Sequence, residues 1–290
     1  MIKDRDVKLE GYYKSHWPVE CGGNRRQKAA NGRLDVKNKQ ARLQSIRNER
    51  WNVMTIFRER EELFLGGTMP SFTGPPPFGW VQKIDPETLE VINETPQLPC
   101  GEHVWCGAIA AHQNGNIIKV NGNYMHSITN QCEVDIEKKL PIDQAHNGLL
   151  VLSDGSIVTK DLRLEGQGRS TITRLNDKLE LMHEPFLLPE GSMGRIASDK
   201  NDDGEFIYIG SRDGTVSKVS AISGELQWKK KLDSPIYQVP QVYGSHIFLI
   251  TNNQKVAFEI LDSYIAVSYT HLRAHETPEH RGCRLRREKK

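Results

Sequence analysis

The sequence predicts an all-β protein, a β-propeller built from four-stranded blades of about 45 residues. Short apolar segments alternate with turn residues from Trp51 onward, with almost no helical period. Asn-Gly and Asp-Gly dipeptides separate these segments, and they favour tight hairpins because glycine tolerates a positive φ. A three-residue phrase recurs at spacings of 43, 47 and 45 residues, which is the length of one blade.

The recurring phrase follows a strand and a turn each time, as Leu89-Glu90-Val91, Cys132-Glu133-Val134, Leu179-Glu180-Leu181 and Gly224-Glu225-Leu226. A β-sandwich, the alternative, would contain short strands without such a period. The stretch 51–265 would hold four to five blades at this spacing. Its last segment, Val256–Ile260, stops within a blade, so we expect a propeller truncated at the C-terminus. Such a propeller would expose an uncovered sheet and be poorly soluble.

Residues 1–50 form a polar, charged N-terminal lead-in ahead of the blades. From Arg25 to Arg50 there are nine Lys/Arg against two acidic residues. One interpretation is a basic arm for phosphate or RNA, but no aromatic residues are interleaved to stack on bases. We therefore expect a solvated segment.

The third part, residues 266–290, has the character of a non-native tail. The run Val267–Thr277 is similar to the translation of a transposase-end adapter used in sequencing libraries. Residues 267–290 hold seven Lys/Arg and three Glu, so the formal net charge of +2 for the whole chain becomes about −2 for residues 1–266. That balance argues against nucleic acid as a partner.

Cysteine spacing and hydropathy bear on the location of the protein. Cys21, Cys100, Cys106 and Cys132 have neither zinc-site nor disulfide-scaffold spacing. No apolar run approaches the roughly 18 residues of a membrane span, and Met1–Asp6 lacks the apolar core of a secretion signal. We expect a cytoplasmic protein that does not bind membranes.

Two phrases, Ile84–Val91 and Ser223–Trp228, resemble the outer-strand turns of the quinoprotein-like (PQQ-like) propeller superfamily. Three longer segments resemble a family of bacterial propeller proteins of unassigned activity: Gly66–Trp80, Glu102–Ala110 and His146–Gly155. These resemblances imply a fold and no reaction.

Polar side chains precede the strands expected to line the central channel, which begin near Gly107, Gly148, Arg195 and Val239. If the blades align, they converge on one channel mouth. Such a set of histidines, carboxylates and an arginine suits a divalent metal or an anionic small molecule. The structural alternative is that they satisfy buried backbone groups and lock turns. The candidate ligand-binding residues are Glu102, His103, Trp105, Asp143, His146, Asn147 and Arg195.

The run from His146-Asn147-Gly148 to Lys160-Asp161 is similar to a motif of gluconolactonase-like propellers. That resemblance implies a metal-dependent hydrolase or lactonase, with Asn147 and His146 at a calcium or zinc ion and Asp143 as base. A third hypothesis is a quinone-dependent oxidoreductase, with Trp105 or Trp80 stacked on the cofactor.

The leading hypothesis is a binding module without catalysis, which holds a small molecule or a protein at the mouth of the central channel. Catalytic residues are not identified by the sequence, and whether the chain is an enzyme stays open.

Overall fold

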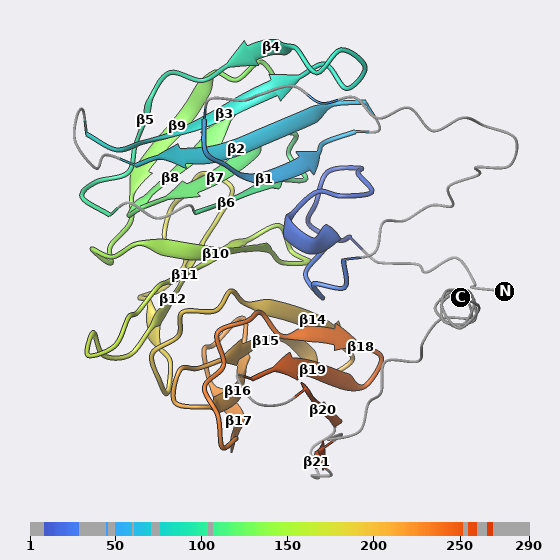
Figure 1. Ribbon diagram of the computed structural model, residues 1–290, viewed down its shortest axis with the longest axis vertical. Helices are drawn as coiled ribbons and strands as arrows, with labels where there is room; N and C mark the ends of the chain where they lie inside the picture. The colour runs from blue at the N-terminus through green and yellow to red at the C-terminus, as the bar shows by residue number, and fades with distance from the viewer. Residues whose placement is uncertain are drawn as a thin grey trace, which may run out of the picture.

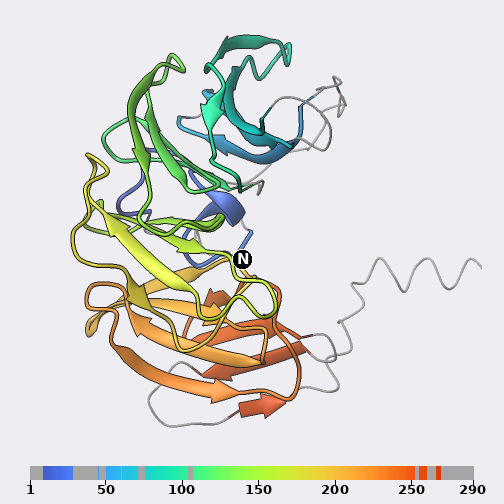
Figure 2. The same ribbon diagram turned by 90° about the vertical axis from the view of Figure 1, so that its left-hand side faces the viewer.

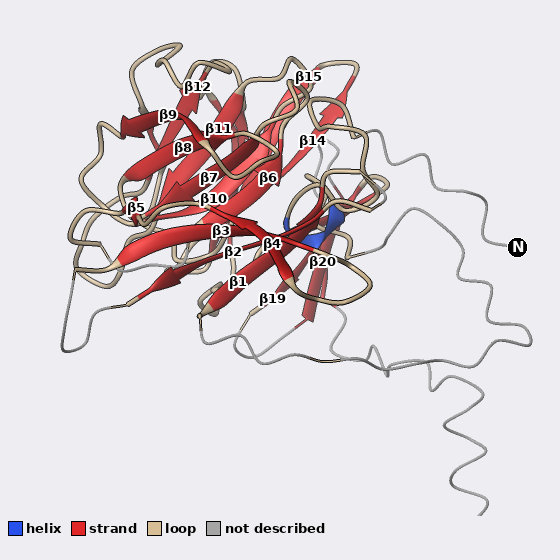
Figure 3. Ribbon diagram, turned by 90° about the horizontal axis from the view of Figure 1, so that it is seen from above, coloured by secondary structure: helices blue, strands red, loops and turns tan. Residues whose placement is uncertain are grey.

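The computed structural model describes residues 9–28, 45, 50–59, 61–70, 76–103, 107–251, 255–259 and 266–268. These residues form an all-β structure of five antiparallel sheets (Figure 1). The 3-10 turn η1 (Glu20–Gly22) is the only helical element among the described residues, as the view from above shows (Figure 3). None of the described residues forms a helix long and apolar enough to cross a membrane.

Each sheet is a meander in which consecutive strands pair. The first contains β1 (Asn52–Phe57), β2 (Leu63–Met69), β3 (Phe78–Ile84) and β4 (Val91–Glu94), with β5 (Leu98–Pro99) also paired to β3. The second contains β6 (Ala108–Ala111), β7 (Ile117–Asn121), β8 (Tyr124–Ile128) and β9 (Val134–Lys139). The third contains β10 (His146–Val151), β11 (Ile157–Asp161), β12 (Thr171–Leu175) and β13 (Phe186–Leu187).

The fourth sheet contains β14 (Ala197–Asn201), β15 (Gly204–Gly210), β16 (Thr215–Ser220) and β17 (Leu226–Lys231). The fifth contains β18 (Gln241–Tyr243), β19 (His246–Ile250), β20 (Lys255–Glu259) and β21 (Ala266–Ser268). The five sheets are the predicted blades, and they follow one another in chain order along an arc (Figure 2). The propeller prediction is therefore confirmed.

Blades pack face to face, so that their middle strands are buried on both sides. Every residue of β7 and of β11 is buried. Apolar clusters fill the layers between blades, with Ile109 between the first and second and Ile207 between the third and fourth. A strand buried on both faces needs apolar or hydrogen-bonded side chains throughout, which explains the short continuous apolar runs in the sequence.

The recurring three-residue phrase is the turn that leads into the outermost strand of a blade. Its first residue has a left-handed backbone in all four copies, with φ of 64° at Leu89, 63° at Cys132, 58° at Leu179 and 71° at Gly224. The following glutamate accepts a backbone hydrogen bond from the residue that ends the preceding strand or follows it, as in Ser220 N to Glu225 O at 2.8 Å. The 45-residue period thus reflects one turn geometry repeated in four blades.

The expectation of a solvated lead-in is wrong for residues 9–28, here called the N-terminal segment. This segment packs inside the arc against the innermost strand of every blade (Figure 2). One backbone N–H of each innermost strand donates to it: Phe57 to Trp17 O, Ala111 to Pro18 O, Val151 to Tyr12 Oη, Ser198 to Asn24 O and Val242 to Arg25 O. The innermost strands are sheet edges, and the segment supplies the acceptors that such edges lack.

Arg26 is the most deeply placed cation of the N-terminal segment, with no exposed surface. Its guanidinium donates to Leu149 O at 2.8 Å, Ile196 O at 2.9 Å and Glu20 O at 2.7 Å. Hydrogen bonds from a charged donor contribute about 1.5–3 kcal/mol each, and they offset the cost of burying the charge. The residue therefore ties the segment to the third and fourth blades.

The fifth blade differs from the others because its second strand is buried on one face only. Ile247 and Leu249 are buried, whereas Phe248 and Ile250 are 39 % and 53 % exposed. The strand β21, whose first residue is Ala266, pairs with β20. Residues 269–290 lie outside the described residues, so the adapter origin of the tail stays a prediction.

The exposed face of β19 (Phe248 and Ile250) and its buried face (Ile247) can be compared by mutation. We expect the double variant Phe248→Thr/Ile250→Thr to lower self-association, measured by light scattering, with little change in the free energy of unfolding. Ile247→Ala should lower that free energy by about 2–4 kcal/mol in urea titrations, because it leaves a cavity in the core. Equal destabilisation by both variants would mean that the Phe248 face is covered.

Candidate functional site

The innermost strands begin at one mouth of the channel, here called the entry mouth, and end at the other, the exit mouth. Arg195, which precedes β14, lies at the entry mouth. Its Nη1 donates to Asn147 O at 2.7 Å and to Gly107 O at 2.9 Å, and its Nε lies 3.1 Å from Glu20 Oε1. The structure thus brings Arg195 and Asn147 together, and it adds Glu20, which sequence reasoning missed.

His103 and Asp143 form a second contact on this side of the protein. His103 Nε2 is 3.2 Å from Asp143 Oδ1, and Asn123 Nδ2 donates to the same oxygen at 2.5 Å. The hydrogen bond with His103 lowers the pKa of the Asp143 carboxyl group. Glu102 is exposed in the same loop as His103. Trp105 and Cys106 lie outside the described residues.

His146 and Asn147 hydrogen-bond in opposite directions from the third blade. His146 Nδ1 contacts Gly122 O and Gln144 O on the side of the second blade. Asn147 Nδ2 donates to Met193 O, in the loop that precedes β14. Burial lowers the pKa of His146 to about 4, so the imidazole is neutral at pH 7. Both side chains link neighbouring blades.

The hypothesis of a metal ion at His146 and Asn147 needs a third ligand close to them. In the part of the chain that is described, no three His, Cys, Asp or Glu side chains group so as to hold a metal ion. His146 Nε2 and Asn147 Oδ1 are buried without a hydrogen-bond partner, but their partnered atoms face different blades. Trp80, the second tryptophan suggested for a quinone, is fully buried.

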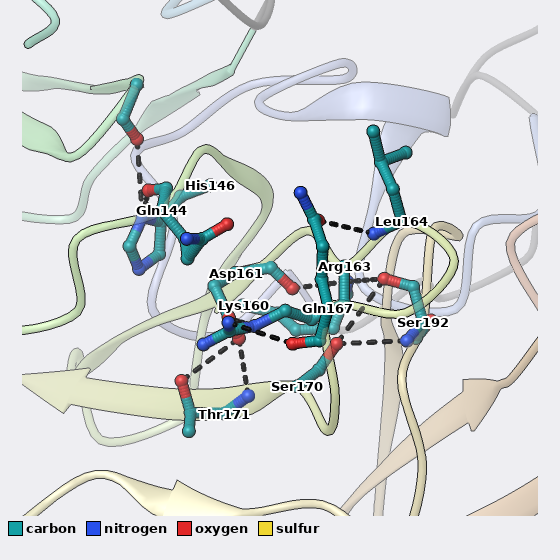
Figure 4. Close-up of polar contacts among 11 residues, drawn as sticks. Gln144, His146, Lys160, Asp161, Arg163, Leu164, Gln167, Ser170, Thr171 and Ser192 are labelled. Atoms are coloured by element: carbon teal, nitrogen blue, oxygen red, sulfur yellow. Dashed lines mark hydrogen bonds and ion pairs between the residues drawn. The ribbon is translucent and has the colours of Figure 1, made fainter. Parts of the chain in front are cut away.

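A buried polar cluster lies beside these residues in the third blade (Figure 4). Lys160 Nζ donates to Asp161 O at 2.8 Å and to Ser192 O at 2.9 Å. The Asp161 carboxylate accepts from Thr171, through N and Oγ1, and from Arg163 Nε. Complete burial lowers the pKa of the Lys160 ammonium group to about 7. The cluster joins β11, β12 and the loop before β14, with the polar atoms satisfied internally.

A polar pocket of about 360 Å³ opens at the exit mouth, where β10 and β14 end. Its walls come from the N-terminal segment (Glu10, Asn24), from Ser153 after β10, and from the fourth blade (Ser198, Asp199, Glu205). Ser198 Oγ is buried and has no hydrogen-bond partner among the described residues. The sequence did not predict this pocket, because three of its ten lining residues, Glu10, Asn24 and Arg25, come from the N-terminal segment.

The carboxylate of Glu205 is the most buried charge in the pocket, at 8 % exposure. It accepts hydrogen bonds from Ser153 N at 3.0 Å and Ser153 Oγ at 2.8 Å. Burial raises the pKa of this carboxyl group. Two ion pairs border it, Arg25 with Asp199 at 2.6 Å and Lys200 with Glu10 at 2.9 Å.

Comparison with solved structures places the chain among β-propellers. It is similar to virginiamycin B lyase from Staphylococcus aureus, with 15 % identity and a TM-score of 0.57 over 82 % of this chain and 76 % of that one. A streptogramin B lyase is 14 % identical, with a TM-score of 0.54 over 81 % of this chain and 74 % of that one. BamB from Moraxella catarrhalis is 13 % identical, with a TM-score of 0.54 over 79 % of this chain and 64 % of that one. These likenesses show the fold alone.

No family model and no curated protein matches the sequence. The superfamily resemblance to PQQ-like propellers therefore stays a prediction, whereas the propeller architecture is shown by the solved structures.

The low pKa of Lys160 has a consequence for stability. Unfolded lysine keeps its proton to about pH 10.5, so between pH 7 and 10.5 the unfolded state binds more protons. The free energy of unfolding should rise across this window, by up to about 1.4 kcal/mol per pH unit. Lys160→Met should remove that rise in urea titrations at several pH values. The exposed Lys178→Met serves as control, and parallel curves for wild type and Lys160→Met would contradict this.

Proposed function

We propose that the chain is a binding propeller that holds a small polar molecule at a mouth of its central channel. The observation that carries the proposal is the exit-mouth pocket, whose volume of about 360 Å³ lies in the range of small-molecule sites. The unpartnered, buried Ser198 Oγ supports it, because a buried hydroxyl without a partner costs free energy that a ligand can offset.

The entry mouth supports ligand binding less well. Arg195 Nη1 donates hydrogen bonds to Asn147 O and Gly107 O. His146 Nδ1 likewise contacts backbone carbonyl oxygens. These contacts favour the structural alternative for the entry-mouth residues. A protein partner, a metal-dependent hydrolase and a quinone-dependent oxidoreductase are alternatives that no observation on the described residues favours.

A thermal-shift screen of the chain against cationic, neutral and anionic polar compounds tests the proposal. A ligand at 100 times its dissociation constant should stabilise the protein by about 2.7 kcal/mol and raise Tm by several degrees. Ser198→Asn, which adds volume inside the pocket, should abolish the shift, whereas the exposed Asp203→Asn should retain it. Absence of any shift, or an equal shift in Ser198→Asn, would contradict a site in this pocket.

A further inference from the structure

The pocket at the exit mouth carries more negative than positive charge. Four carboxylates and two cations line it: Glu10, Asp199, Asp202, Glu205, Arg25 and Lys200. Both cations are already engaged, Arg25 by Asp199 and Lys200 by Glu10. The pocket therefore holds a surplus of two carboxylates, those of Glu205 and Asp202.

Of these two, Glu205 has the stronger need of a cation. Its carboxylate is almost fully buried, and its hydrogen bonds come from neutral donors on Ser153. The cation nearest in the fold is its cross-strand partner Lys200, whose charge acts on Glu205 but whose ammonium group is ion-paired with Glu10. Burial therefore removes hydration that neutral donors and a shared cation only partly replace. A positively charged group entering the pocket would compensate for this loss.

The strand register places the hydroxyl group of Ser198 on the same face of the fourth blade as Glu205. Lys200 pairs with Glu205, and Ser198 lies two residues before Lys200 on β14. Because side chains on a strand alternate, Ser198, Lys200 and Glu205 share the face of the fourth blade that lies toward Ser153. Ser198 Oγ, buried and unpartnered, can bond a ligand hydroxyl beside the carboxylate of Glu205.

We infer that the pocket takes a small hydroxylated amine, with its ammonium group on Glu205 and a hydroxyl group on Ser198. This inference rests on the proposed function and adds the chemical class of the ligand. A pocket of about 360 Å³ has room for an amino sugar or amino alcohol. Arg25 and Lys200 would stay in their ion pairs and close the sides of the site.

The test compares three probes that share one sugar ring: glucosamine, glucose and glucuronate, titrated into the full chain by calorimetry at pH 6.5. We expect glucosamine to bind at least about tenfold more tightly than the other two. Glu205→Gln should weaken glucosamine about tenfold and Ser198→Ala about threefold. Asp203→Asn, an exposed carboxylate outside the pocket, should bind as wild type does.

Because Glu205→Gln keeps the shape of the side chain and removes a buried charge, its Tm should equal or exceed that of wild type. Glucose or glucuronate binding as tightly as glucosamine would overturn the amine class and leave pocket binding intact. No heat from any of the three would overturn the inference, and the wider thermal-shift screen then decides the proposed function by itself. Unchanged glucosamine binding in Glu205→Gln would also overturn it.

Discussion

The hydrogen bonding between residues 9–28 and the innermost strands is the interaction on which the rest of the structure depends. Each blade presents an edge strand to the centre of the arc, and each edge donates one N–H to this segment. Arg26 of the segment also donates hydrogen bonds to one carbonyl oxygen on each of two neighbouring blades. An open row of edge strands would leave buried donors unpaired, and the segment removes that cost at five places. The blades are thus joined through the centre as well as through their faces.

Because residues 9–28 fill the centre of the arc, the proposed ligand site lies at a mouth of the channel. At the entry mouth, Glu20 and Arg195 pair across the end of the segment. At the exit mouth Asn24 lies between β10 and β14, because its Nδ2 donates to Val151 O and its carbonyl oxygen accepts from Ser198 N. The pocket opens beside it, with Glu205 in the wall. The same contacts that stabilise the propeller therefore shape the pocket. A ligand there would bridge the N-terminal segment and the fourth blade.

The blades could be predicted from sequence because their signals are local. The turn at Leu89, Cys132, Leu179 and Gly224 needs only adjacent residues, so its period is visible in the chain. The role of residues 9–28 could not be predicted, because the carbonyl groups of the third and fourth blades that accept from Arg26 lie more than 100 residues away in the sequence. The directions in which the His146 and Asn147 side chains point depend on a β-bulge between His146 and Gly148. No sequence motif predicts this bulge.

Hydrogen exchange on the five donor amides, in wild type and in Arg26→Met, tests the role of the segment most directly. These amides are those of Phe57, Ala111, Val151, Ser198 and Val242. If the segment holds the blades together, all five should be protected in wild type and should lose protection together in the variant, while the amides of β7, β11 and β15 stay slow. Rapid exchange of the five in wild type, or unchanged protection in Arg26→Met, would contradict the account.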